Sequence, residues 1–300
     1  MAGPSALASV PGFSPFGPMS RFGELAPVGS LPPGRDVELP GRGSTYVLDT
    51  GERVDQDRPT LVLLHALACT AALTWYPVID ALATKGRVVT LDQRWHGRGI
   101  RSDRFTLEDC ADDVAALGDV LGLDRFVVVG YSMGSLVAQL AARAHPDRVA
   151  GMVLCAGTTG FKRNARERIA LDALNGSMAT LRPGAGRRPE VDGDPVGRQR
   201  EWLMGQFRST SPGAVGRAVA EVGKFDSSGW IADLTLPTSV VVTATDQVIP
   251  ARRQHWMARQ IAGAATYEVQ AGHGACVLAA DEFRSGLMPA VASVTSRVRP

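Results

Sequence analysis

The chain has 300 residues, of which 45% are apolar and 21% are charged, so it can bury a large core and is not expected to be disordered. Its 32 basic and 30 acidic residues leave a net charge of +2, without the basic excess that is typical of nucleic-acid-binding proteins. No apolar run reaches the ~18 residues that a membrane span needs. These observations predict a soluble protein with no nucleic-acid partner and no membrane span.

The first 34 residues are rich in proline, glycine and serine and show neither a helical nor a strand period. They lack a basic start, and prolines interrupt their apolar stretches, which is unlike a secretory signal peptide. We therefore expect a flexible leader over 1–34 and a cytoplasmic location. The four cysteines are far apart and form no C-x-x-C pair, so no disulfide framework is expected.

Strand and helix patterns alternate after the leader. In chain order, the predicted strands cover a hairpin at 35–51 that turns at Pro40-Gly41, then 60–66, 87–93, 125–131, 149–157, 238–246 and 265–274. The predicted helices between them include 72–86, 106–123 and 133–146, and a helix follows each of the last two strands. This alternation predicts an α/β fold with a mostly parallel central sheet and helices on both faces.

The alternation is interrupted once. Residues 161–234 show only helical patterns, including apolar residues at i, i+3, i+4 and i+7 from Val215 to Val222. We predict a core that comprises 35–160 and 235–300, with a helical cap at 161–234 inserted between them.

Residues 130–134, GYSMG, follow a valine-rich strand and begin a helix. Gly130 and Gly134 have no Cβ, so the chain can turn sharply and present the Ser132 hydroxyl to a cleft. The helix N-terminus at Met133 adds free N–H groups and the positive end of the helix dipole. This context predicts a nucleophile at Ser132, and a plain tight turn is the alternative.

A serine hydroxyl needs a base that takes its proton, and the chain has five histidines. His273 lies between two glycines just after the last predicted strand, at the edge of the sheet where ligands bind. It also follows the serine, as a Ser…Asp…His order requires, so we predict it as the base. We interpret His145 and His255 as structural or surface residues, whereas His65 and His96 could line the cleft.

The acid that orients the histidine should also follow a strand. Asp246 does so in VVVTATDQVIP, and an Asx turn is its structural alternative. Asp92, Arg94 and His96 follow another strand and could bind substrate, but we interpret them as a structural loop with an Arg94–carboxylate pair. The backbone N–H groups of Leu67 and Met133 are the predicted oxyanion hole. No residue set has zinc-like spacing and no phosphate-binding loop is visible, so we expect neither a metal nor a cofactor.

At this point the chain resembles the α/β-hydrolase superfamily, in its capped group of esterases, lipases and C–C hydrolases. The resemblance covers about residues 35–300 and is carried by His65-Ala66, DQRWHGRG (92–99), GYSMG, AHPDRVAGMVL, TDQVIP and GHGA. It implies this fold and the triad of Ser132, His273 and Asp246. One departure is Ala66, because the family usually has glycine there. The relatives with an acid nucleophile, dehalogenases and epoxide hydrolases, carry Asp where this chain has Ser132.

These observations together predict a serine hydrolase that cleaves a carboxylic ester with a small to medium apolar acyl group. Tyr131, Phe207 and Val219 are the predicted substrate-binding residues. Hydrolysis of a thioester or a C–C bond, or cofactor-free perhydrolysis, would use the same triad. A binding protein of another class, which captures a small ligand on this fold without catalysis, is the remaining alternative.

Overall fold

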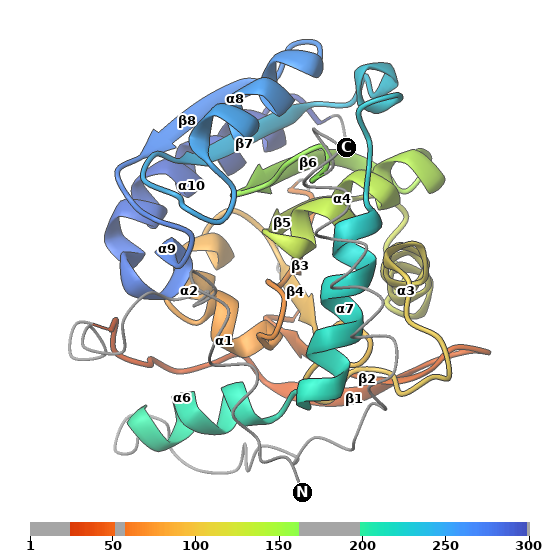
Figure 1. The fold of residues 1–300 in the computed structure, drawn as a ribbon. Helices are drawn as coiled ribbons and strands as arrows, with labels where there is room; N and C mark the ends of the chain where they lie inside the picture. The colour runs from red at the N-terminus through yellow and green to blue at the C-terminus, as the bar shows by residue number, and fades with distance from the viewer. Residues whose placement is uncertain (1–24, 52–57, 162–198, 299–300) are drawn as a thin grey trace, which may run out of the picture.

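The computed structural model describes residues 25–51, 58–161 and 199–298, which form an eight-stranded sheet between two layers of helices (Figure 1). The sheet has the order β1-β2-β4-β3-β5-β6-β7-β8. Its strands are β1 (Gly34–Leu39), β2 (Gly43–Asp49), β3 (Thr60–Leu64), β4 (Val88–Leu91), β5 (Phe126–Tyr131), β6 (Val149–Cys155), β7 (Thr238–Thr243) and β8 (Ala265–Val269). From β4 to β8 all neighbours are parallel, whereas β2 pairs antiparallel with both β1 and β4. The predicted α/β fold class is confirmed.

Most of the helices cover one or the other face of this sheet. In chain order, the helices of the described residues are α1 (Ala71–Trp75), α2 (Ile79–Ala83), α3 (Leu107–Val120), α4 (Met133–Ala144), α6 (Gln199–Arg208), α7 (Pro212–Lys224), the 3₁₀ turn η3 (Ile231–Asp233), α8 (Ala251–Gln260), α9 (Ala275–Leu278) and α10 (Ala280–Thr295). One buried cluster joins the sheet to α3, α4 and α8, and the other joins it to α1, α2 and α10. Successive residues of β3 alternate between them, Leu61 and Leu63 in one cluster and Val62 and Leu64 in the other. A strand buried on both faces has to be apolar throughout, which explains its continuous run.

Several predicted elements differ in their bounds from the observed ones; for example, β7 ends at Thr243 and not at residue 246. The helix expected at 72–86 is divided into α1 and α2 at Pro77, which has no N–H to donate within a helix. The last strand ends at Val269, earlier than expected, and leaves a loop that carries His273. The hairpin turn is where the sequence predicts it, because Gly41 adopts a φ of 71° between β1 and β2.

The expected flexible leader over 1–34 needs a correction at its end. Residues 1–24 lie outside the described residues, but 25–33 pack on the core and Gly34 begins β1. Val28 is buried, and the carbonyl of Ala26 accepts hydrogen bonds from Tyr76 Oη and Gln199 Nε2. The apolar contacts of Val28 and these two bonds hold a segment that has no periodic pattern of its own.

Helices α6 and α7 belong to the predicted cap and lie outside the two flanking layers (Figure 1). The cap boundaries stay a prediction, because 162–198 lie outside the described residues. Gly160 and Asp226 form an antiparallel β-bridge, which we call the neck. Beside it, Ser227 donates a hydrogen bond of 2.6 Å from Oγ to Gln139 Oε1 of α4. The neck therefore brings Gly160, just before the predicted cap, and Asp226, near the end of the predicted cap, to one point on the core.

In the part of the chain that the structure describes, no helix is long and apolar enough to cross a membrane.

Candidate active site

Ser132 lies at the corner between β5 and α4 with φ 52° and ψ −115°. Such positive φ values are unfavourable for residues other than glycine and persist only where the surrounding structure imposes them. A Cβ at Gly130 would approach Gly134 O to 2.2 Å, and one at Gly134 would approach Leu64 O to 2.1 Å. The two glycines therefore let α4 begin directly against the ends of β5 and β3, and this packing holds Ser132 at the corner.

The three residues predicted as a triad form one hydrogen-bonded chain. Ser132 Oγ lies 2.8 Å from His273 Nε2, and His273 Nδ1 lies 2.7 Å from Asp246 Oδ2. They come from the β5–α4 corner, the β8–α9 loop and the β7–α8 loop, at the carboxyl edge of the sheet. Since Nδ1 faces a carboxylate, it carries the ring proton and leaves Nε2 free to accept the serine proton.

The Asp246 carboxylate is enclosed by hydrogen-bond donors, and its side chain has no exposed surface. Oδ1 accepts the backbone N–H groups of Val248 and Ile249, each at 2.8 Å. Oδ2 accepts the Thr243 hydroxyl at 2.7 Å in addition to the histidine. The Asx turn that was the alternative for Asp246 is therefore present too, and the same side chain makes the turn and contacts His273.

Tyr131, a predicted substrate-binding residue, is in a different place from the expected one. Its side chain is 1% exposed and packs against the rings of Trp75, Phe283 and His273. Its hydroxyl donates a hydrogen bond of 2.8 Å to the backbone carbonyl of His273. A buried side chain that is engaged in this way is unavailable to a substrate, so the prediction for Tyr131 is wrong. It supports the histidine loop instead.

The predicted oxyanion donor Leu67 is a central residue of a tight turn, which we call the oxyanion turn (residues 66–69). Cys69 N donates to Ala66 O at 3.2 Å and closes the turn. This bond does not use the Leu67 N–H. Ala68 adopts a φ of 61°, in a turn position that favours glycine, whereas Ala66 has no positive φ. The alanine that replaces the family's glycine therefore fits an ordinary backbone, and the strain lies two residues further on.

The second predicted donor, Met133, is the first residue of α4, so its N–H has no acceptor within the helix. The close approach of Gly134 to the end of β3 brings this helix N-terminus beside the residues that lead into the oxyanion turn. The assignment of Leu67 and Met133 as an oxyanion hole stays a prediction.

Phe207 on α6 and Val219 on α7 are half-buried. Phe207 packs against the buried cluster that contains Trp202 and Leu203. Part of the apolar surface of the cap thus packs onto the core. The contribution of Phe207 and Val219 to substrate binding stays a prediction.

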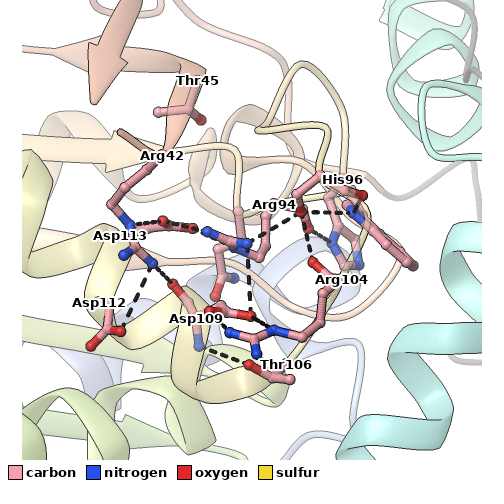
Figure 2. Close-up of polar contacts among 12 residues, drawn as sticks. Arg42, Thr45, Arg94, His96, Arg104, Thr106, Asp109, Asp112 and Asp113 are labelled. Atoms are coloured by element: carbon pink, nitrogen blue, oxygen red, sulfur yellow. Dashed lines mark hydrogen bonds and ion pairs between the residues drawn. The ribbon is translucent and has the colours of Figure 1, made fainter. Parts of the chain in front are cut away.

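The loop after β4 has the structural role that the sequence suggests. Arg94 donates two hydrogen bonds of 2.7 Å to the carboxylate of Asp113, and its side chain is 6% exposed. Figure 2 shows this pair within a network in which Arg42 also contacts Asp113 and Arg104 contacts Asp109. Because Arg94 is paired and buried, it holds α3 to the loop and does not face a ligand.

Two buried histidines that were candidates for the cleft are also structural. Gln93 N donates to His65 Nε2, and His96 Nδ1 lies 3.1 Å from the carbonyl of Arg94. Burial lowers the pKa of His65 to about 3 and that of His96 to about 4, so both are neutral near pH 7. Burial raises the pKa of Asp92 to about 6, against the lowering effect of the backbone N–H groups of Arg98 and Ala71.

Comparison with known proteins agrees with this architecture. The family model of the alpha/beta hydrolase fold matches residues 59–189. A protein of Caulobacter sp. strain K31 named putative carbamate hydrolase RutD is 27% identical over 243 residues, 77% of this chain and 90% of the relative. Epoxide hydrolase B of Mycobacterium tuberculosis is 32% identical over 190 residues, 62% of this chain but 48% of the relative.

Solved structures are similar over nearly their whole length. A hydrolase from Pseudomonas aeruginosa PA01 is 25% identical with a TM-score of 0.66, and the match covers 87% of this chain and 97% of that one. A thermophilic esterase from Thermogutta terrifontis is 23% identical with a TM-score of 0.69, over 88% and 99% of the two chains. At that identity, the likeness to the esterase shows the fold alone.

Proposed function

The chain belongs to the α/β-hydrolase fold family, and we propose that it is a serine hydrolase that cleaves carboxylic esters by acyl transfer. The observation that carries the proposal is the hydrogen-bonded chain from Ser132 through His273 to Asp246. The backbone strain at Ser132 supports it, because strained non-glycine residues concentrate at functional sites.

In the proposed reaction, Ser132 Oγ attacks the ester carbonyl while His273 Nε2 takes its proton. The N–H groups of Leu67 and Met133 stabilise the oxyanion of the tetrahedral intermediate. As the intermediate collapses, His273 protonates the departing alcohol and an acyl-serine remains. Water then attacks the acyl-serine, His273 takes one proton of the water and returns it to Ser132, and the carboxylic acid leaves. Asp246 stabilises the imidazolium form in both halves of the reaction.

Ester cleavage is proposed ahead of epoxide opening because the attacking group in the proposed mechanism is the Ser132 hydroxyl, not a carboxylate. We infer a small to medium apolar acyl group from the apolar residues of the cap, of which Phe207 and Val219 are half-buried. Carbamates and thioesters present a similar carbonyl to the serine, so they belong in the same substrate screen. The name of the Caulobacter relative makes carbamates the first alternative to measure.

The test combines covalent labelling with turnover. A fluorophosphonate probe should label the wild-type protein and not Ser132→Ala. p-Nitrophenyl esters should be hydrolysed by the wild type, with kcat about 10⁴- to 10⁶-fold lower in Ser132→Ala and in His273→Ala. Assays with thioesters, carbamates and vinylogous diketones rank these substrate classes against the esters. A folded wild-type protein that is not labelled would indicate a non-catalytic binder, and Ser132→Ala turnover within tenfold of wild type would exclude the mechanism.

A further inference from the structure

We propose that Gln206, a residue of the cap helix α6, is a positioning residue that holds the oxyanion turn in its catalytic geometry. This inference rests on the proposed function and deepens it, because it assigns the cap a role in transition-state stabilisation as well as in substrate choice.

The oxyanion turn needs support from outside itself. Ala68 has a φ of 61°, a conformation that is unfavourable for an L-residue. On the upstream side, the Ala66 N–H lies 3.3 Å from Thr74 Oγ1, which is a long hydrogen bond. Just before the turn, Gln93 Nε2 also donates to the His65 carbonyl at 2.8 Å. Thr70 is the point at which the strained turn is held from the downstream side.

Thr70 connects the oxyanion turn to the cap. It is the N-cap of α1, and its Oγ1 accepts the Leu73 N–H at 3.0 Å. The same hydroxyl donates a hydrogen bond of 2.5 Å to Gln206 Oε1. Thr70 is 1% exposed and Gln206 is 2% exposed, so water does not compete for this bond. A buried side-chain hydrogen bond between residues 136 positions apart places α6 directly against the end of the oxyanion turn.

A second hydrogen bond fixes the same end of α6 to the core. Thr210, just after α6, accepts the Gly97 N–H through Oγ1 at 3.1 Å. Gly97 belongs to the loop after β4. Asp92 lies in the same loop, and its Oδ1 accepts the Ala71 N–H at 2.8 Å. Because Thr210 anchors α6 independently, loss of the Gln206 acceptor should loosen the oxyanion turn without detaching the cap helix.

The expected effect is on the transition state. The carbonyl oxygen of a bound ester carries little charge until Ser132 attacks, so a displaced oxyanion donor weakens the tetrahedral state more than the ground state. A Gln206 variant should therefore have a lower kcat and an almost unchanged KM. It should also lose affinity for a trifluoromethyl ketone, which forms a tetrahedral adduct with a catalytic serine.

The decisive variant is Gln206→Met, which has a similar volume and offers the Thr70 hydroxyl only a weak thioether acceptor in place of the amide oxygen. Glu201→Gln, an exposed change on the same helix, is the control. We expect Gln206→Met to lower kcat at least tenfold, to weaken trifluoromethyl ketone binding by a similar factor, and to keep KM within twofold. In a Thr70→Val background, Gln206→Met should cause little further loss, because the two changes remove the same bond.

Several outcomes would overturn the proposal. The first is an unchanged kcat in Gln206→Met, and the second is an effect of Gln206→Met that appears mainly as a higher KM. The third is a double variant whose fold-loss in kcat equals the product of the fold-losses of Thr70→Val and Gln206→Met. If Gln206→Met does not fold, Thr70→Ser, which keeps the hydroxyl, is compared with Thr70→Val, and equal kcat values would contradict the proposal. Failure of the proposed function is distinguishable, because then the wild type itself would show neither labelling nor ester turnover.

Discussion

The Tyr131 hydroxyl donates a 2.8 Å hydrogen bond to the backbone carbonyl of His273, so the residue before the candidate nucleophile supports the loop of the candidate base. This bond joins the end of strand β5 to the β8–α9 loop, and the two residues are 142 positions apart in the sequence. The Tyr131 ring packs between Trp75 and Phe283, which fixes the direction of the hydroxyl. The separation of Ser132 from His273 thus depends on a side chain that takes no part in the proposed proton transfers.

Tyr131→Phe removes this donor and keeps the ring. We expect kcat for ester hydrolysis to fall by about tenfold with KM nearly unchanged, because a small displacement of a catalytic group is costly. The free energy of unfolding should fall by about 1 kcal/mol, the contribution of one buried hydrogen bond. Steady-state kinetics and urea denaturation measure the two effects. Tyr267→Phe, in β8, is the control, and a Tyr131→Phe enzyme with wild-type kcat would show that the histidine loop is held without this bond.

Asp246→Asn tests the orienting role of the carboxylate. An amide at this position can still accept the N–H groups of Val248 and Ile249 through its oxygen. Its NH₂ group, however, would face His273 Nδ1, which favours the tautomer with the proton on Nε2. That tautomer cannot accept the serine proton, so kcat should fall by about 10⁴-fold. Stopped-flow or long-time ester assays measure the decrease, and a loss below tenfold would remove Asp246 from the proposed mechanism.

The buried titratable groups predict how stability changes with pH. His65 and His96 have folded pKa values of about 3 and about 4, below the ordinary 6.5, so each stabilises the fold fully above pH 6.5. As the pH falls below 6.5, the unfolded chain binds protons that the fold excludes, and each histidine lowers stability by about 1.4 kcal/mol per pH unit. Asp92, with its pKa raised to about 6 from 3.8, acts in the opposite direction between those values.

The net expectation for these three groups is a loss of about 1.4 kcal/mol when the pH falls from 5.5 to 4.5. Urea denaturation at the two pH values measures it. In His96→Gln, the stability lost through His65 and the stability gained through Asp92 should nearly cancel over this range. The free energy of unfolding should then be almost the same at the two pH values. An equal decrease in wild type and His96→Gln would show that other groups cause the acid sensitivity.

The apolar residues of the cap predict a chain-length preference. We expect kcat/KM for p-nitrophenyl esters to rise from acetate to butyrate–octanoate and then to fall, with each buried methylene contributing about 0.8 kcal/mol. Phe207→Asp and Val219→Asp should flatten this profile and leave fluorophosphonate labelling of Ser132 intact. A profile that neither change alters, or a preference for charged acyl groups, would show that these residues do not select the substrate.

The segment before β1 predicts a stability effect far from the candidate active site. Val28 is 2% exposed, so Val28→Ala removes two buried methyl groups and should lower the free energy of unfolding by about 2 kcal/mol. Ser30→Ala, an exposed neighbouring change, is the control. Thermal unfolding measures both. Equal melting temperatures for Val28→Ala and Ser30→Ala would mean that the burial of Val28 does not stabilise the fold.

The β/α alternation and the order of the three candidate residues were readable in the sequence because both depend on local patterns. Strand ends show as the end of an apolar run, and loops that follow parallel strands meet at one edge. Ser132, Asp246 and His273 could therefore be selected without coordinates. The division of the first predicted helix was also readable in principle, since Pro77 lies within it.

Other features depend on contacts between distant segments. The direction of the Tyr131 side chain is set by Trp75 and Phe283, which no local pattern connects to it. The docking of Val28 and the bond from Thr70 to Gln206 are likewise long-range. The positive φ at Ala68 was not readable either, because alanine carries no sequence signal for that conformation.

The neck between Gly160 and Asp226 has a consequence for how such a chain can diversify. Since the inserted segment leaves and rejoins the core at neighbouring points, its length and sequence can change at a small entropic cost to the rest of the fold. Strand order, the serine corner and the histidine loop all lie on the other side of that junction. Under the proposed function, the segment is an interchangeable module, and we expect its replacement to change specificity while Ser132, His273 and Asp246 are retained. The bond between Thr70 and Gln206 sets one condition on such a replacement, which is that the new module must again present an acceptor to the threonine.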